Sequence, residues 1–67
     1  MANYTEKYRD VFDFHKERAR HLENSDAFWK ETSLRMTEIS VKYRADPFVT
    51  DMLVSIYSEL ERQAANG

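Results

Sequence analysis

The chain has 67 residues, with 12 acidic and 10 basic side chains, a net charge of −2, a hydrophobic share of 42% and no cysteine. This length accommodates one domain at most, and the lack of cysteine excludes a disulfide-rich secreted module. A chain so close to neutral has no general electrostatic attraction to nucleic acid or anionic lipid. The sequence shows neither a signal peptide nor a transmembrane run, so we expect one domain over residues 1–67, in the cytoplasm and without membrane contact.

The first predicted helix covers residues 4–23. Asn3, followed three residues later by Glu6, is typical of a helix start. Side chains at steps of three and four indicate a helix and exclude a strand. They form one predicted core-facing stripe: Tyr4, Tyr8, Val11, Phe12, His15, Ala19 and Leu22. Phe14 lies about a quarter turn or more from this stripe, so we expect it to be exposed.

The second predicted helix covers residues 26–44, after a break at residues 24–26. The break contains residue types that suit helix ends, but no Gly or Pro enforces it, so one continuous helix through Ser25 is the structural alternative. One face, which we expect to lie in the core, spans about 100° of the helix. It carries Phe28, the only tryptophan Trp29, Thr32, Met36, Ile39 and Tyr43.

The third predicted helix covers residues 47–64. Asp46 is a good N-cap, and Pro47 is favoured at a first helical position, where its missing N–H costs nothing. The apolar stripe that follows is the most regular of the three: Phe48, Val49, Met52, Leu53, Ile56, Tyr57, Leu60 and Ala64. We expect residues 1–3 and 65–67 to fray.

Three helices joined by short connections favour antiparallel neighbours. We therefore predict an all-α fold, a small antiparallel three-helix bundle with up-down-up order. Ordering a chain costs about 1.5 kcal/mol per residue, so a core of this size gives only marginal stability.

The back of the second predicted helix carries a narrow apolar row. Ala27, Leu34 and Val41 recur every seven residues, roughly opposite the tryptophan face, with charged side chains beside them. Such a row is typical of a helix that contacts another chain. We predict a partner interface there, with Phe14 as a second exposed contact. The alternative is that a middle helix touches two neighbours, which leaves Leu34 as an ordinary, partly exposed residue.

Arg9, Lys16 and Arg20 form a basic stripe on the first predicted helix. Three cations on one side of a helix can contact phosphates, so a nucleic-acid-associated regulator is the alternative function. A helix-turn-helix reader of DNA needs a basic last helix, whereas the last helix here is acidic. We therefore expect nucleic-acid binding to be the weaker alternative.

Asp13, Glu17 and His21 lie on one side of the first predicted helix. Carboxylates with a histidine can hold a divalent cation, but no second helix supplies a matching set of ligands. We expect a solvated charged face, without a metal or cofactor.

The chain lacks the sequence features of an enzyme. It has no cysteine, no internal glycine to form a nucleophile elbow or a phosphate loop, and no H-E-x-x-H. In size and composition it resembles the small helical accessory proteins encoded by bacteria, phages and mobile elements, a likeness that carries no motif. We predict a small non-enzymatic protein that acts by protein–protein interaction or self-association.

Overall fold

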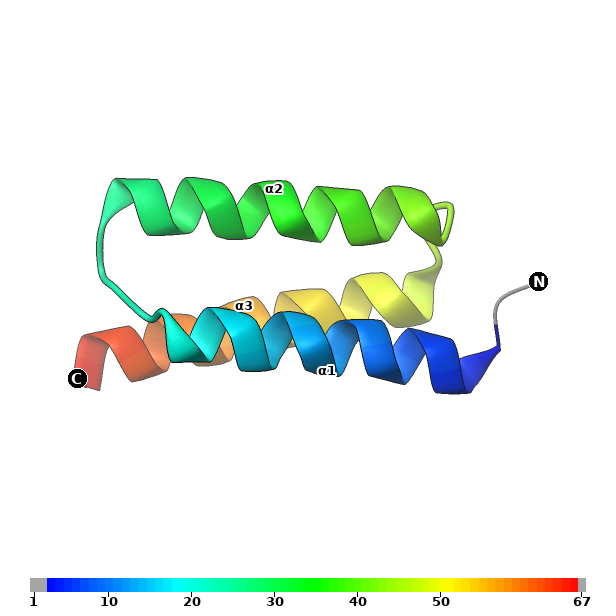
Figure 1. Cartoon of the computed structure of the whole chain (residues 1–67), viewed down its shortest axis with the longest axis horizontal. Helices are drawn as coiled ribbons and strands as arrows, with labels where there is room; N and C mark the ends of the chain where they lie inside the picture. Colours follow the sequence, from blue (N-terminus) through cyan, green and yellow to red (C-terminus); the bar gives the residue numbers. More distant parts are fainter. Residues whose placement is uncertain (1–2, 67) are drawn as a thin grey trace.

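The computed structural model describes residues 3–66, which form three helices and no strand. Helix α1 spans Tyr4–Arg20, α2 spans Asp26–Lys42 and α3 spans Pro47–Asn66. Helices α1 and α3 run in the same direction and α2 runs in the opposite one (Figure 1). The predicted antiparallel three-helix bundle is therefore confirmed. No helix in the described part of the chain combines the length and apolarity that crossing a membrane requires.

Each helix begins at its predicted residue, after a side-chain cap. The caps are Asn3, Ser25 and Asp46. In each case the side-chain oxygen accepts a hydrogen bond from the backbone N–H three residues later, at 2.9, 3.2 and 3.0 Å respectively. These bonds satisfy backbone donors that the first turn of a helix leaves without partners. The break at Ser25 is real, and the continuous-helix alternative is wrong.

Helix α2 ends at Lys42, two residues before the predicted end. The backbone N–H of Ala45 donates to the carbonyl of Ser40 over 2.8 Å, and that of Arg44 donates to Val41 over 3.1 Å. This pair of bonds is the Schellman motif, which ends a helix with a left-handed residue. Here two non-glycine residues are left-handed, Arg44 with φ 54° and Ala45 with φ 58°. This helix end could not be predicted from residue types, because glycine, which often occupies the left-handed position, is absent here.

The other helix ends also differ from the prediction. Helix α1 stops at Arg20 rather than at residue 23, since His21 caps it with backbone bonds back to the last turn. Helix α3 continues through Asn66, two residues beyond the predicted end, and the fraying expected for residues 65–66 stays a prediction. Asn3 caps α1, whereas the predicted fraying of residues 1–2 and 67 lies outside the described residues.

The core lies where all three helices meet. Its central cluster consists of Val11, Phe14, Tyr43, Val49 and Leu53, each at most 7% exposed. Half-buried side chains pack around this cluster: Met36, Ile39, Met52 and Ile56. The core faces predicted for the second and third helices are confirmed, although Trp29 is only half-buried.

The core face predicted for the first helix is mostly wrong, and Val11 is the one residue of the predicted stripe that is fully buried. Phe14, expected to be an exposed partner contact, is 4% exposed and belongs to the core. Tyr4, Tyr8 and Phe12, expected in the core, are 64%, 57% and 63% exposed. The buried residues of α1 are Val11, Phe14 and Arg18. The helix is thus turned by roughly 70° from the predicted orientation, at 100° per residue.

Candidate functional site

An exposed aromatic surface lies on α1 beside the start of α3. We call it the aromatic face and define it as Tyr4, Tyr8, Phe12 and Phe48. Phe48 meets both tyrosines edge to face, with ring centroids 5.5 Å apart in each pair. Edge-to-face contacts of this kind add to the free energy of area burial. The tyrosine rings are therefore held in place although they face solvent.

A shallow apolar groove runs along α3 from the aromatic face. Val11 and Ile56 line it from the core side, together with Phe48 and Met52, while Asp51 and Ser55 are exposed along it. The groove extends the aromatic face toward the middle of the bundle. Together they form one continuous apolar surface between α1 and α3.

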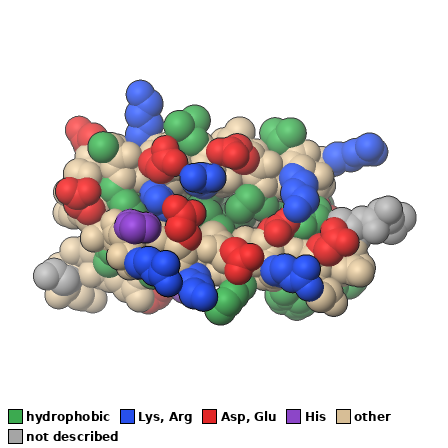
Figure 2. Space-filling view, viewed as in Figure 1, with side chains coloured by type: hydrophobic (Ala, Val, Ile, Leu, Met, Phe, Trp, Pro, Cys, Tyr) green, Lys and Arg blue, Asp and Glu red, His purple; other side chains and the backbone are tan. Residues whose placement is uncertain are grey.

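The groove between α1 and α2 has the opposite character. Charged side chains line it: Asp10, Asp13, Glu17, Arg35, Glu38 and Lys42. Phe14 and Ile39 contribute its apolar floor. Figure 2 shows red and blue side chains interspersed around a hollow with green atoms inside. Since the two signs are mixed, this groove offers no uniform field to a charged partner.

Asp10 ties α1 to the end of α2. Lys42 Nζ donates to Asp10 Oδ2 over 2.6 Å, and the Tyr43 hydroxyl donates to the same oxygen over 2.5 Å. The hydrogen bond from Lys42, and then that from Tyr43, lowers the pKa of Asp10 below 3.8. The bond to Asp10 raises the pKa of Lys42, and burial, with the same carboxylate, raises the pKa of Tyr43. The carboxylate is thus held charged between two donors.

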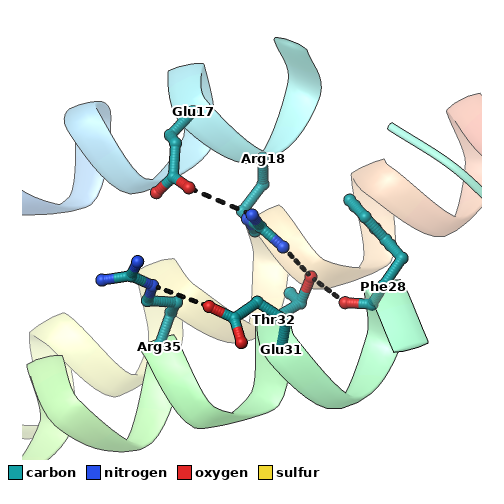
Figure 3. Close-up of polar contacts among 6 residues, drawn as sticks. All are labelled: Glu17, Arg18, Phe28, Glu31, Thr32 and Arg35. Carbon is teal, nitrogen blue, oxygen red and sulfur yellow. Dashed lines mark hydrogen bonds and ion pairs between the residues drawn. The ribbon is translucent and has the colours of Figure 1, made fainter. Parts of the chain in front are cut away.

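Arg18 is a charged side chain inside the bundle, only 6% exposed. Its Nη1 donates to the Thr32 hydroxyl over 3.3 Å, and its Nη2 donates to Glu17 over 3.0 Å. The Thr32 hydroxyl in turn donates to the Phe28 carbonyl, so one chain of bonds crosses from α1 to α2 (Figure 3). The Arg18 guanidinium also lies over the Phe28 ring, 5.1 Å from its centroid. Its Nε has no hydrogen-bond partner among residues 3–66. The periodicity of α1 did not reveal this interior cation.

The outer row of α2 consists of Ala27, Leu34 and Val41. All three are exposed, Leu34 at 53% and Val41 at 71%. The predicted exposure of this row is confirmed. It agrees both with a contact surface and with the alternative, in which Leu34 is an ordinary, partly exposed residue. Its role as a contact surface stays a prediction. The row differs from the aromatic face in having no aromatic side chain.

The basic stripe of α1 is exposed along its length. Arg9, Lys16 and Arg20 face solvent, and within residues 3–66 none of them takes part in an ion pair. Their proposed contact with nucleic acid stays a prediction. The same part of the chain contains no group of three or more acidic, histidine or cysteine side chains placed to hold a metal ion. Asp13, Glu17 and His21 are therefore not brought together as a ligand set.

Sequence reasoning missed the aromatic face, and the spacing of its residues gave no decisive signal. Tyr4, Tyr8 and Phe12 are each four residues apart, and four residues advance a helix by about 400°, which leaves 40° per step. Phe12 therefore lies about 80° around α1 from Tyr4. Since a core-facing arc can be about 100° wide, this spacing fits a buried row as well as an exposed one.

Comparison with known proteins gives no match: no family model, no curated protein and no solved structure is significantly similar to this chain. The function is therefore inferred from the geometry alone.

Proposed function

We propose that this chain acts without catalysis, by binding a protein through the aromatic face. The observation that carries the proposal is the exposure of Tyr4, Tyr8 and Phe12, between 57% and 64% each, in one row on one helix. Aromatic residues, tyrosine among them, are enriched at protein interfaces and among the residues that dominate binding energy.

The arrangement of the rings favours binding further. Each exposed aromatic side chain that becomes ordered on binding costs conformational entropy. Phe48 already restrains Tyr4 and Tyr8 by edge-to-face contacts. Tyr4 and Tyr8 therefore lose less conformational entropy on binding than unrestrained rings would. The same buried ring area then gives a higher affinity.

The outer row of α2 is a second candidate contact surface. Leu34 and Val41 are two turns apart on the same side of the helix, and both are more than half exposed. They provide less apolar area than three rings, and no neighbouring ring restrains them. The two surfaces lie on different sides of the bundle, so variants can separate their contributions.

The experiment compares three forms of the chain as bait in the cells from which the gene comes. They are wild type, the aromatic-face variant Tyr8→Ser/Phe12→Ser and the outer-row variant Leu34→Ser/Val41→Ser. A protein recovered with wild type is then purified, and its complex with each form is measured by calorimetry. We expect the aromatic-face variant to bind roughly tenfold to a hundredfold more weakly, as hot-spot truncations do.

The outer-row variant should bind the purified partner as wild type does. If instead this variant loses binding and the aromatic-face variant keeps it, the outer row of α2 is the contact surface. If the wild-type chain binds no purified protein and no second copy of itself, the proposed function is wrong. Circular dichroism of both variants should match wild type, since all four substituted side chains are exposed.

A further inference from the structure

We propose that the protein bound at the aromatic face is a second copy of this chain, in a parallel two-fold dimer whose Arg9 faces Asp51 of the other chain. This inference rests on the proposed function and names the occupant of the same surface. Three features of the face carry it: its area, the heights of its side chains along the bundle, and the charges at its two edges.

The exposed area matches a large part of one side of a stable interface. An aromatic side chain presents about 150–250 Å², so three rings that are about 60% exposed leave roughly 350 Å² of apolar surface in solvent. One partner in a standard-size interface buries about 800 Å². The rings alone supply nearly half of that, and the groove beside α3 and the edges of the face supply more.

The heights of the side chains follow from the contacts of Phe48. Since Phe48 touches both Tyr4 and Tyr8, it lies at a height between them. Helices α1 and α3 run in the same direction (Figure 1), so equal steps along each helix keep side chains level. Met52, four residues after Phe48, is then level with the gap between Tyr8 and Phe12.

The edges of the face carry opposite charges at one height. On α1, the side chains that follow one another from the core outward across the face are Val11, Tyr8 and Arg9. On α3, the corresponding side chains from the core outward are Val49, Phe48 and Asp51. Arg9 is three residues beyond the midpoint of Tyr4 and Tyr8, and Asp51 is three residues beyond Phe48. Both side chains are exposed. One edge of the face is therefore basic and the other is acidic, at the same level.

A two-fold axis parallel to the helices makes this arrangement self-complementary. Rotation by 180° about such an axis places α1 of one chain against α3 of the other without changing any height. Arg9 of each chain then meets Asp51 of the other chain, one pair at each edge. Phe48 and Met52 of one chain lie on either side of Tyr8 of the other chain. An antiparallel two-fold would instead bring the basic edges of both chains together, where like charges repel.

The test measures molar mass by light scattering and dissociation by sedimentation, over dilutions from millimolar to low micromolar chain. Wild type should weigh twice the chain mass at high concentration and dissociate on dilution. Phe12→Ser should be monomeric throughout. The matched control is Val41→Ser, which removes an equally exposed apolar side chain from α2 and should dimerise like wild type. A dimer that Val41→Ser breaks and Phe12→Ser leaves intact overturns the inference.

Charge reversal tests the pairing of the edges. Arg9→Asp and Asp51→Arg should each weaken the dimer by roughly tenfold or more, because two repulsive contacts replace two attractive ones. The double variant Arg9→Asp/Asp51→Arg should dimerise like wild type, since the exchanged charges still attract. A double variant as weak as the single ones overturns the parallel arrangement, since an antiparallel dimer would keep like charges together.

The outcomes for this inference and for the proposed function are separable. A wild-type chain that is monomeric at every concentration overturns self-association. That result does not test whether the aromatic face binds a different protein. Calorimetry of the purified partner with wild type and the aromatic-face variant tests that proposal separately. Circular dichroism melts of each variant confirm that the bundle remains folded, so a lost dimer reports a lost contact.

Discussion

Helix α1 meets its two neighbours by different means. Polar bonds cross its seam with α2: Asp10 to Lys42 and Tyr43, and Arg18 to Thr32. Its seam with α3 is mainly apolar, from the edge-to-face contacts of Phe48 to the buried Val11 and Val49, with one ion pair, Lys7 to Asp46 at 3.4 Å, at the start of α3. One helix therefore packs with more polar bonds on one side and mainly through buried apolar area on the other.

The difference shows what the orientation of α1 has to satisfy. Apolar packing is non-directional, so several rotations of a helix bury similar areas. In the observed rotation Val11 and Phe14 face the core, and Arg18 is buried with them. A buried cation costs free energy without partners, and Thr32 and Glu17 accept hydrogen bonds from Arg18. The polar bonds therefore compensate the burial of Arg18, while Tyr4, Tyr8 and Phe12 point away from the core and form the exposed part of the aromatic face.

Truncation in the apolar core should have the largest effect. Leu53 is 2% exposed and belongs to the central cluster. Leu53→Ala should lower the free energy of unfolding by about 2–4 kcal/mol, because a cavity remains after the side chain is removed. Urea denaturation measures the change. The adjacent exposed residue is the control: Val54→Ala should change stability by at most about 0.5 kcal/mol. Equal losses in the two variants would contradict the assignment of the core.

Removing one partner of the polar seam should have an intermediate effect. Thr32→Val leaves Arg18 Nη1 without its acceptor and should lower the free energy of unfolding by about 1–3 kcal/mol. Arg18→Met, which removes the buried charge itself, should be neutral or stabilising by about 1 kcal/mol. The double variant should resemble Arg18→Met, and the resulting coupling energy measures the seam directly. Additive effects would show that the two side chains act independently.

A change outside both seams should stabilise the bundle slightly. Arg44 adopts φ 54° at the end of α2, a conformation that costs a non-glycine residue about 1–2 kcal/mol. Arg44→Gly should raise the free energy of unfolding by about 1 kcal/mol, after the greater backbone entropy of glycine is deducted. Lys30→Gly, within α2 and exposed, is the matched control and should lower stability by roughly 0.5–1 kcal/mol. A loss in both variants would contradict the left-handed turn.

The smallest effect should be the pH dependence from Asp10. Its pKa is lowered in the folded state, so its stabilising bonds are complete above the ordinary pKa of an aspartate and are lost as the pH falls through the lower folded pKa. The difference in unfolding free energy between wild type and Asp10→Asn should therefore vanish in strong acid. It should also shrink in high salt, since Lys42 is exposed. Urea denaturation at neutral and acidic pH measures this difference in unfolding free energy. A difference that is the same at both pH values would show that the titration of Asp10 does not contribute to stability.

Most of the bundle follows from the residues in their order along the chain. Three periodic segments, the caps at Asn3, Ser25 and Asp46 and the proline after the last of these predict three helices and their starts. The core faces of the second and third helices follow from periodicity as well. Each depends on side-chain spacing within a few turns, which is a local property of the backbone.

The rotation of α1 depends on contacts between distant residues. Periodicity specifies the angles among Tyr8, Val11 and Phe14, but which of them points inward depends on the side chains of α2 and α3 that they meet. The ends of α1 and α2 are formed by local backbone bonds, and the sequence marks neither end with the glycine that often follows a helix. The aromatic face is therefore a product of tertiary packing: one apolar arc of α1 faces solvent because the neighbouring arc, which carries Val11 and Phe14, packs in the core.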